Sequence, residues 1–257
     1  MKVVILCGGK GIRIRDLSEE LPKPMIPIGR YPIVHHIMSI YSHYEFNEFV
    51  LCLGYKSWKF KEYFLNYRLE TTDITIDLAN SGKVDFHKEH KIPPWKITLA
   101  ETGMEAMTGC RIKRIQKYIG NNTFMLTYGD GVSDVNIKSL MDFHRSHGKL
   151  VTVTSVRPIS RFGELVVDGD AVKDFQEKTQ TSDGLINGGF FVCEPGTFDY
   201  VSEDENCSWE MEPLKHLARD GQLMTYVHDG FWMPMDTTRE YILLNQLWNK
   251  NEAPWKT

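Results

Sequence analysis

Short apolar runs that alternate with amphipathic helical segments constrain the fold of this chain more than any other feature. The runs VVILC (3–7) and EFVLCLGY (48–55) are almost continuously apolar. Strands of that kind are buried on both faces, as in parallel sheets, whereas strands with one solvated face alternate polar and apolar residues. Segment 31–44, with Pro32 near its start, and segment 137–148 have the spacing of amphipathic helices. The sequence therefore predicts an α/β fold with a mixed, mostly parallel central sheet.

The second half of the chain adds β-structure to this pattern. FGELVVDGDAVKDFQEK (162–178) is expected to form a hairpin around Asp168-Gly169-Asp170, and LINGGFFVCE (185–194) a strand entered through its glycines. Residues 68–107 are rich in charge and contain Pro93-Pro94, and we interpret them as an irregular insertion. With no internal repeat or flexible linker, we predict a single domain over 1–257.

Charge and cysteine content exclude several classes of protein. The formal net charge of −4 argues against nucleic acid as a partner, because nucleic-acid binders have a basic excess. The five cysteines show no CxxC spacing, which disfavours a zinc site or a disulfide framework and favours a reducing compartment. No run approaches the 18 or so apolar residues of a membrane span, and no signal-peptide pattern opens the chain. We therefore expect a cytoplasmic protein with no membrane partner.

The stretch CGGKGIRIRDLSEELPKPM (7–25) follows the first apolar run directly. Ligands of open α/β sheets bind beyond the carboxyl ends of the strands, and a glycine-rich loop there lets backbone N–H groups approach phosphate oxygens. Neither common phosphate fingerprint fits. A Walker A motif would need glycine at Val4, and a GxGxxG motif starting at Gly9 would need glycine at Ile14. A dehydrogenase is thereby disfavoured.

Two cations near these glycines change the interpretation. A glycine cluster alone is as often a tight turn as a phosphate loop. Arg13 and Lys23 add fixed positive charge, which a triphosphate needs when it loses pyrophosphate. Phosphate chemistry is the favoured hypothesis.

The motifs GGKGIR and KPM (23–25) together resemble the signature of the sugar-phosphate nucleotidyltransferases. Further motifs similar to those of that family are TYGDGVSD, QEK (176–178), INGGFF, WEMEPL and GFWMPMDT. The combination of MTGCRIKR with TYGDG, INGGFF, GFWMPMDT and the terminal APWKT is most similar to its cytidylyltransferases that use glucose 1-phosphate. The resemblance covers nearly the whole chain. It implies a Rossmann-like three-layer fold, with a nucleotide-binding part at about 1–135 and a sugar-phosphate-binding part at about 136–257.

The reaction that the resemblance implies is attack of a sugar 1-phosphate on the α-phosphate of CTP, with loss of pyrophosphate, to supply surface-polysaccharide sugars. Such a nucleophile needs no general base, because the second pKa of a phosphate monoester is about 6. Arg13 and Lys23 would act as catalytic cations. The resemblance also implies a nucleotide site made of Leu6, Gly8, Gly9, Gly11, Ile12, Arg13, Lys23, Thr108, Gly109, Arg111 and Gly129.

Asp130 and Asp236 are the acids that the resemblance assigns to catalysis and to Mg²⁺. Two carboxylates suffice, because Mg²⁺ in such enzymes takes its other ligands from substrate phosphates and water. Taken singly, each acid would more often be a turn residue or a helix N-cap, and Asp236 before Thr-Thr-Arg-Glu is a good cap candidate. For the sugar phosphate, the resemblance implies Tyr128, Glu177, Lys178, Asn187, Gly188 and Trp232.

Two departures keep alternatives open. Ile12 stands where the family usually has threonine, and Thr179 where it usually has proline. A lost hydroxyl contact would weaken binding by about 1–3 kcal/mol. The alternatives are a different sugar-phosphate or non-sugar acceptor, and a catalytically silent binding subunit. Close relatives of the family assemble as oligomers, hexamers included, so a homo-oligomer is expected, with 68–107 as a candidate contact.

Overall fold

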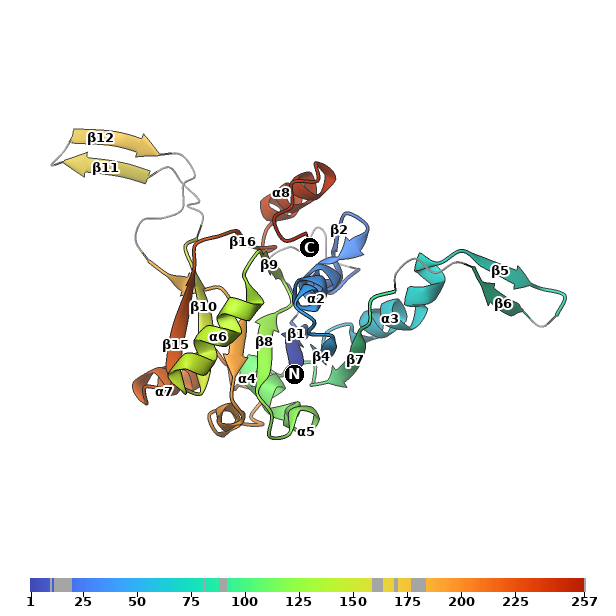
Figure 1. Cartoon of the computed structure of the whole chain (residues 1–257), viewed down its shortest axis with the longest axis horizontal. Helices are drawn as coiled ribbons and strands as arrows, with labels where there is room; N and C mark the ends of the chain where they lie inside the picture. The colour runs from blue at the N-terminus through green and yellow to red at the C-terminus, as the bar shows by residue number, and fades with distance from the viewer. Residues whose placement is uncertain are drawn as a thin grey trace.

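A central eight-stranded sheet organises the described part of the chain (Figure 1). The computed structural model describes residues 1–9, 11, 20–80, 82–87, 92–158, 164–168, 171–176 and 184–256. Across the sheet the strands follow the order β7 (Lys96–Glu101), β4 (Glu48–Leu53), β1 (Lys2–Leu6), β8 (Phe124–Tyr128), β14 (Phe191–Cys193) with β13 (Ile186–Asn187), β10 (Val151–Val156) and β15 (Leu223–His228).

Strand direction confirms the mixed, mostly parallel sheet. β1 pairs in parallel with β4 and β8, β4 with β7, and β10 with β15. Only the position occupied by β14 and β13 runs antiparallel to its neighbours. The parallel strands therefore end at one edge, where a ligand site is expected.

The strands are apolar throughout because both faces of the sheet are covered. Val3 and Ile5 of β1 pack into one core, and Val4 and Leu6 into the other. The first core includes residues of the helices α2 (Ile33–His43), α6 (Ile137–His147) and α8 (Thr238–Asn249). The second core includes residues of the helices α4 (Thr108–Arg114), α5 (Gln116–Ile119) and α7 (Glu212–Arg219). Helix layers thus lie on both sides of the sheet, as the three-layer prediction requires.

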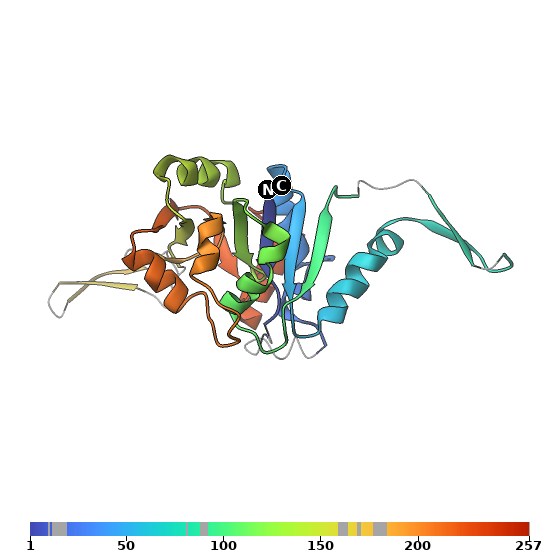
Figure 2. The ribbon, with the colours of Figure 1, turned by 90° about the horizontal axis from the view of Figure 1, so that it is seen from below.

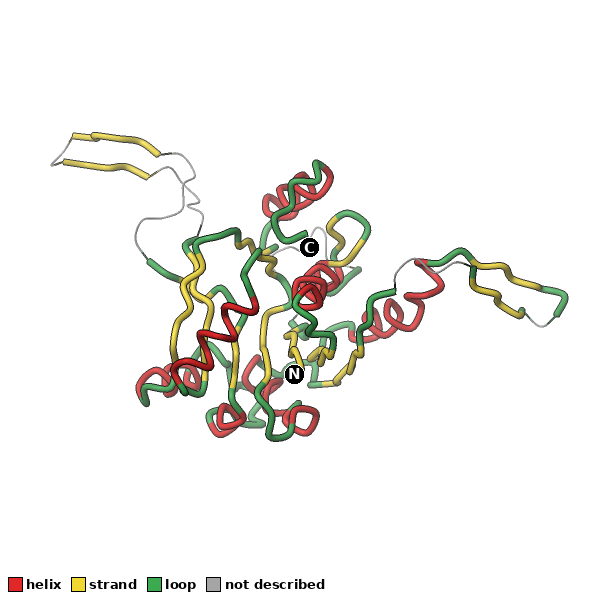
Figure 3. The backbone as a smooth tube through the Cα atoms, viewed as in Figure 1, coloured by secondary structure: helices red, strands yellow, loops and turns green. Residues whose placement is uncertain are grey.

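Two-stranded ribbons complete the fold. β2 (Pro27–Ile28) pairs with β3 (Tyr31–Pro32), and β9 (Gly131–Ser133) with β16 (Trp232–Pro234). The predicted hairpin is confirmed as β11 (Glu164–Asp168) and β12 (Ala171–Gln176). β5 (Ile74–Asp77) and β6 (Lys83–Phe86) form another hairpin beyond α3 (Ser57–Thr71). Both hairpins project from opposite ends of the body (Figures 2 and 3).

The interpretation of 68–107 as irregular was wrong. This stretch contains the last turn of α3, the hairpin β5–β6 and strand β7, which extends the central sheet. The predicted strand at 185–194 is interrupted, because Gly188 and Gly189 separate β13 from β14. No helix in the described ranges is long and apolar enough to cross a membrane.

Candidate active site

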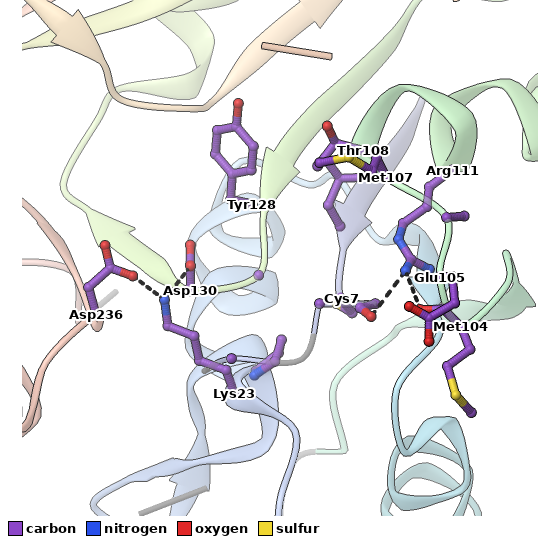
Figure 4. A pocket seen from close by; sticks show the side chains of 17 residues that line it. Cys7, Lys23, Met104, Glu105, Met107, Thr108, Arg111, Tyr128, Asp130 and Asp236 are labelled. Carbon is purple, nitrogen blue, oxygen red and sulfur yellow. Dashed lines mark hydrogen bonds and ion pairs between the residues drawn. The ribbon is translucent and has the colours of Figure 1, made fainter. Parts of the chain in front are cut away.

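A cavity of about 600 Å³ opens at the carboxyl ends of β1 and β8 (Figure 4). Strand ends, the glycine loop, the 3₁₀ turn Lys23–Met25 and the start of α4 all contribute to its walls. Its lining includes the predicted site residues Leu6, Gly8, Gly9, Gly11, Lys23, Thr108, Arg111, Tyr128, Gly129, Asp130 and Asp236. The structure thus gathers residues from both ends of the chain at one edge of the sheet.

The pairing of β9 with β16 brings the two predicted metal ligands together. Asp130 immediately precedes β9, and Asp236 follows β16. The Met235 N–H donates to the backbone oxygen of Asp130 at 2.7 Å, which fixes the two segments to each other. The Asp236 N–H in turn donates to a carboxylate oxygen of Glu240 at 2.6 Å. The N-cap of α8 is Thr237, so the alternative of Asp236 as the cap was wrong.

Lys23 lies between these carboxylates. Its Nζ is 2.6 Å from Oδ2 of Asp130 and also pairs with Oδ1 of Asp236 (Figure 4). Burial alone lowers the pKa of Lys23, but the two carboxylates outweigh burial and hold the pKa above its ordinary value. The side chain therefore stays an ammonium ion. One cation bound by both acids shows that the pair can hold positive charge at a single point.

Glycine at position 129 permits the close packing that places Lys23. A Cβ atom there would lie 2.9 Å from the backbone oxygen of Leu6 and 2.9 Å from Cγ of Pro24. Gly11 has a φ of +60°, a conformation that favours glycine. The turn that contains Lys23 can thus pack directly against the strand ends.

Arg111 binds the protein backbone from within the wall of the cavity. Arg111 is 4% exposed, and its guanidinium group donates to the backbone oxygens of Leu53, Gly103 and Gly8 at 3.0, 2.7 and 3.1 Å. It also donates to Oγ1 of Thr102 at 2.9 Å. This one side chain therefore joins the end of β4 to the segments that follow β1 and β7. Whether Arg111 also contacts a nucleotide stays a prediction.

Residues predicted for the sugar phosphate meet beside Tyr128. Nδ2 of Asn187 donates to the Tyr128 hydroxyl at 3.0 Å, and the indole N–H of Trp232 donates to the backbone oxygen of Gly188 at 2.7 Å. Of the other predictions, Gly109 packs against Cys207. Ile12, Arg13, Glu177, Lys178 and the departure at Thr179 lie outside the described residues.

The segment between β7 and α4 was missed as part of the site. Met104, Glu105, Ala106 and Met107 line the cavity, and Met104 and Met107 are exposed. The only sequence signal is the pair of methionines before the expected helix, since flexible methionines suit a surface that contacts ligands.

The chemistry of the lining favours charge stabilisation over covalent catalysis. Cys7 is the thiol of the cavity, but burial raises its pKa well above the ordinary value, so it stays protonated. In the described ranges, no group of three or more His, Cys, Asp or Glu residues is placed to hold a metal ion. The two carboxylates match the donor set of Mg²⁺, which is bound by one or two carboxylates together with substrate phosphates.

Comparison with known proteins agrees with this geometry. The family model for nucleotidyl transferases matches residues 2–249. Glucose-1-phosphate cytidylyltransferase of Salmonella typhi is 46% identical over 258 residues, and the match covers 100% of this chain and 99% of that protein. The probable glucose-1-phosphate cytidylyltransferase of Bacillus subtilis is also 46% identical, with the same coverage of both chains. A crystal structure of a putative glucose-1-phosphate thymidylyltransferase from Bacillus anthracis covers 96% of this chain and 94% of its own, with a TM-score of 0.70 at 16% identity, and supports the fold. This chain belongs to the nucleotidyl transferase family.

Proposed function

We propose that this enzyme transfers CMP from CTP to α-D-glucose 1-phosphate, giving CDP-glucose and pyrophosphate, as a supplier of sugars for surface polysaccharide. The observation that supports this best is the junction of Lys23, Asp130 and Asp236 at the mouth of a glycine-lined cavity. Full-length relatives at 46% identity whose names specify this activity support the choice of nucleotide and acceptor.

The acceptor phosphate is the nucleophile in this mechanism. It is largely ionised at neutral pH, so the protein need not supply a base. The glycine loop would admit the triphosphate, and the Lys23 ammonium would leave the carboxylates to contact the α-phosphate region, where both reactants meet. Catalysis would rest on in-line positioning and on neutralising the charge of the departing pyrophosphate. Arg13, outside the described residues, is proposed for the β,γ-phosphates.

We propose Mg²⁺ as the cofactor, held by Asp130 and Asp236. When bound, Mg²⁺ would neutralise phosphate charge and orient the triphosphate. The protein's part is to hold the two carboxylates close to each other. The β9–β16 pairing and the Glu240 carboxylate support this by fixing the backbone on either side of the acids.

Two alternatives remain as outcomes of experiment. A different phosphate acceptor would keep the charge cluster and change only the contacts near Tyr128 and Asn187. A silent binding subunit is disfavoured, because binding alone does not require an ammonium group and two carboxylates at one point.

A homo-oligomer in the cytoplasm is part of the proposal. Helix α3 and the hairpin β5–β6 beyond it form a projecting arm, on which Leu65 and Leu78 are 80% and 86% exposed. An isolated two-stranded hairpin is marginally stable in water, so a second copy of the chain is the proposed support for β5–β6. All five cysteines are free. Replacing Leu65 and Leu78 by serine should lower the molar mass measured by light scattering. An unchanged molar mass would show that this arm takes no part in the contact between copies.

The decisive experiment measures pyrophosphate release with Mg²⁺ and glucose 1-phosphate across CTP, UTP, dTTP, ATP and GTP. We expect turnover with CTP to exceed that with each other nucleotide, and to disappear when Asp236 is replaced by asparagine. Turnover with another sugar phosphate would redirect the acceptor. Absence of turnover with any acceptor, while CTP raises the melting temperature, would favour the binding subunit.

A further inference from the structure

Trp232 is hydrogen-bonded to the turn formed by residues 187–190, between β13 and β14. Its indole N–H donates to the backbone oxygen of Gly188 at 2.7 Å, which joins β16 to this turn. An indole has one polar group, and that group is a donor. Because the protein itself uses this donor, Trp232 has no polar atom left to hydrogen-bond a sugar phosphate. Its role in the site must therefore be carried by the turn that it contacts.

The 187–190 turn has an unusual backbone conformation. Gly189 has a φ of +77°, and Phe190, which is 1% exposed, has a φ of +45°. A left-handed φ at a bulky residue is rare and persists only where the surroundings enforce it. A Cβ atom at position 188 would lie 2.8 Å from Cγ1 of Val156, so the turn also packs closely against β10. A turn of this kind keeps its shape through its contacts.

Two strands supply those contacts. On the β10 side, the Gly188 N–H donates to the backbone oxygen of Thr154 at 2.9 Å, and the Thr154 N–H donates to the oxygen of Gly189 at 3.2 Å. The Thr154 hydroxyl donates to the backbone oxygen of Phe190 at 2.8 Å. On the β16 side, Trp232 binds the Gly188 oxygen. Gly188 is thus held at its N–H by β10 and at its oxygen by β16.

The side chain of Asn187 is oriented within this turn. Its Oδ1 accepts from the Gly189 N–H at 2.9 Å, so its Nδ2 is the group that donates to the Tyr128 hydroxyl at 3.0 Å. Tyr128 lines the cavity, and Asn187 is exposed beside it. Beyond these two bonds, the amide has one N–H and one oxygen lone pair, a combination that suits a sugar hydroxyl. The placement of the turn therefore sets the direction of the amide.

β16 holds the charged part of the site by separate bonds. It pairs with β9 through its backbone, with Trp232 opposite Ser133 and Pro234 opposite Gly131. The Met235 N–H then binds the backbone oxygen of Asp130. None of these bonds involves the indole ring, so loss of the indole N–H should leave the two carboxylates in place.

We propose that Trp232 is a positioning residue that fixes the 187–190 turn and thereby orients Asn187 for a hydroxyl group of the acceptor sugar. The proposal rests on the proposed function for the identity of that acceptor. Because Asp236 follows β16 directly, the same strand places the sugar turn relative to the charge cluster.

The kinetic test compares Trp232→Phe with Asn187→Ala and with both together. We expect Trp232→Phe to raise KM for glucose 1-phosphate about tenfold, because one lost hydrogen bond misaligns a binding contact. The values of kcat and of KM for CTP should change less than about threefold. Because Trp232 acts through Asn187, the double variant should resemble Asn187→Ala alone. Additive effects, or an unchanged KM for glucose 1-phosphate in Trp232→Phe, would overturn the proposal.

Two controls separate positioning of the turn from general damage to β16. The affinity of Trp232→Phe for Mn²⁺, measured by calorimetry, should equal that of the wild type, since the carboxylates are held by other bonds. Trp248→Phe, in the last turn of α8, should leave every kinetic constant unchanged. Weaker Mn²⁺ binding in Trp232→Phe would assign the residue to the stability of the strand and refute its specific role.

Hydrogen exchange separates this inference from the proposed function. The Gly189 N–H donates to Oδ1 of Asn187, so its exchange rate, measured by NMR, reports how well the amide is oriented. With no sugar phosphate present, we expect this rate to rise about tenfold in Trp232→Phe and to stay unchanged in Trp248→Phe. An unchanged rate in Trp232→Phe would refute the link between Trp232 and Asn187. A faster rate without turnover of glucose 1-phosphate by the wild type would refute only the proposed acceptor.

Discussion

Replacement of Gly8 by alanine should destabilise the protein through a residue far away in sequence. A Cβ atom at position 8 would lie 2.1 Å from Nη1 and 2.2 Å from Cζ of Arg111. Carbon atoms in contact normally stay about 3.5–4.0 Å apart, so the guanidinium group would have to move by more than about 1 Å. Arg111 is buried and donates to Gly8, Leu53, Gly103 and Thr102, so any such movement breaks hydrogen bonds.

The size of the effect follows from these bonds. A hydrogen bond to a charged group contributes about 1.5–3 kcal/mol, and the displaced guanidinium group would lose at least two of them. We expect Gly8→Ala to lower the free energy of unfolding by about 3–5 kcal/mol. For a chain of this size, each kcal/mol lowers the melting temperature by about 2–4 °C, so a decrease on the order of 10 °C should be seen by thermal unfolding.

Gly9→Ala is the matched control. A Cβ at position 9 meets no atom within 4 Å, so its melting temperature should stay close to that of the wild type. The two variants alter the same loop, and only the contact with Arg111 separates them. Arg111→Met removes the obstructing group, so adding Gly8→Ala to that variant should cost much less than Gly8→Ala alone. Equal melting temperatures for the two glycine variants, or additive losses in the double variant, would refute the reasoning.

Three further predictions concern the charge cluster, a buried histidine and a helix start. Lys23→Met should lower kcat/KM by about 10²-fold or more, because the variant loses a cation that stabilises phosphate charge. The same variant should bind Mn²⁺ more tightly without nucleotide, as measured by calorimetry, because the Lys23 ammonium group of the wild type pairs with Asp130 and Asp236. Weaker Mn²⁺ binding would contradict this. Burial lowers the pKa of His35 to about 3, so its stabilising effect is complete above about pH 6.5 and is lost as pH falls toward 3. Urea unfolding at pH 5 should therefore show a loss of about 2 kcal/mol from this group, absent in His35→Phe; equal losses in both proteins would exclude His35 as the cause. Thr237→Ala removes the side-chain half of a capping box and should lower stability by about 1 kcal/mol, with no change expected in Thr238→Ala.

The layers of the fold could be predicted because burial on both faces leaves a signal in each strand. Residues 3–6 alternate between the two cores, so every position is apolar, and the same holds for most of β4. β7 was not predicted because it lacks this continuous apolar run. It lies at the end of the sheet and pairs only with β4 among the described strands, so polar residues at Lys96 and Glu101 are tolerated.

The site was predictable in composition but not in geometry. Glycines and cations after a buried strand indicate phosphate chemistry, whereas the meeting of Asp130 with Asp236 depends on the pairing of β9 with β16, about a hundred residues apart in the chain. No local pattern contains that information, and the family resemblance supplied it. Arg111 has a structural contact that its sequence position did not predict. The family resemblance assigns it to the nucleotide, and the structure shows in addition that its guanidinium group donates to backbone oxygens.

The charged groups of the site are held in place by residues that need not contact substrate. Asp236 is fixed because its N–H donates to Glu240, and the same Glu240 oxygen accepts from the Thr237 N–H at 2.9 Å as part of the cap of α8. The position of a proposed metal ligand is thus set by the start of a helix. A carboxylate on a free loop would lose conformational entropy whenever it bound a cation, whereas one held by a capped helix has already lost much of it on folding. The stability of α8 and the affinity of the site for its cation should therefore change together.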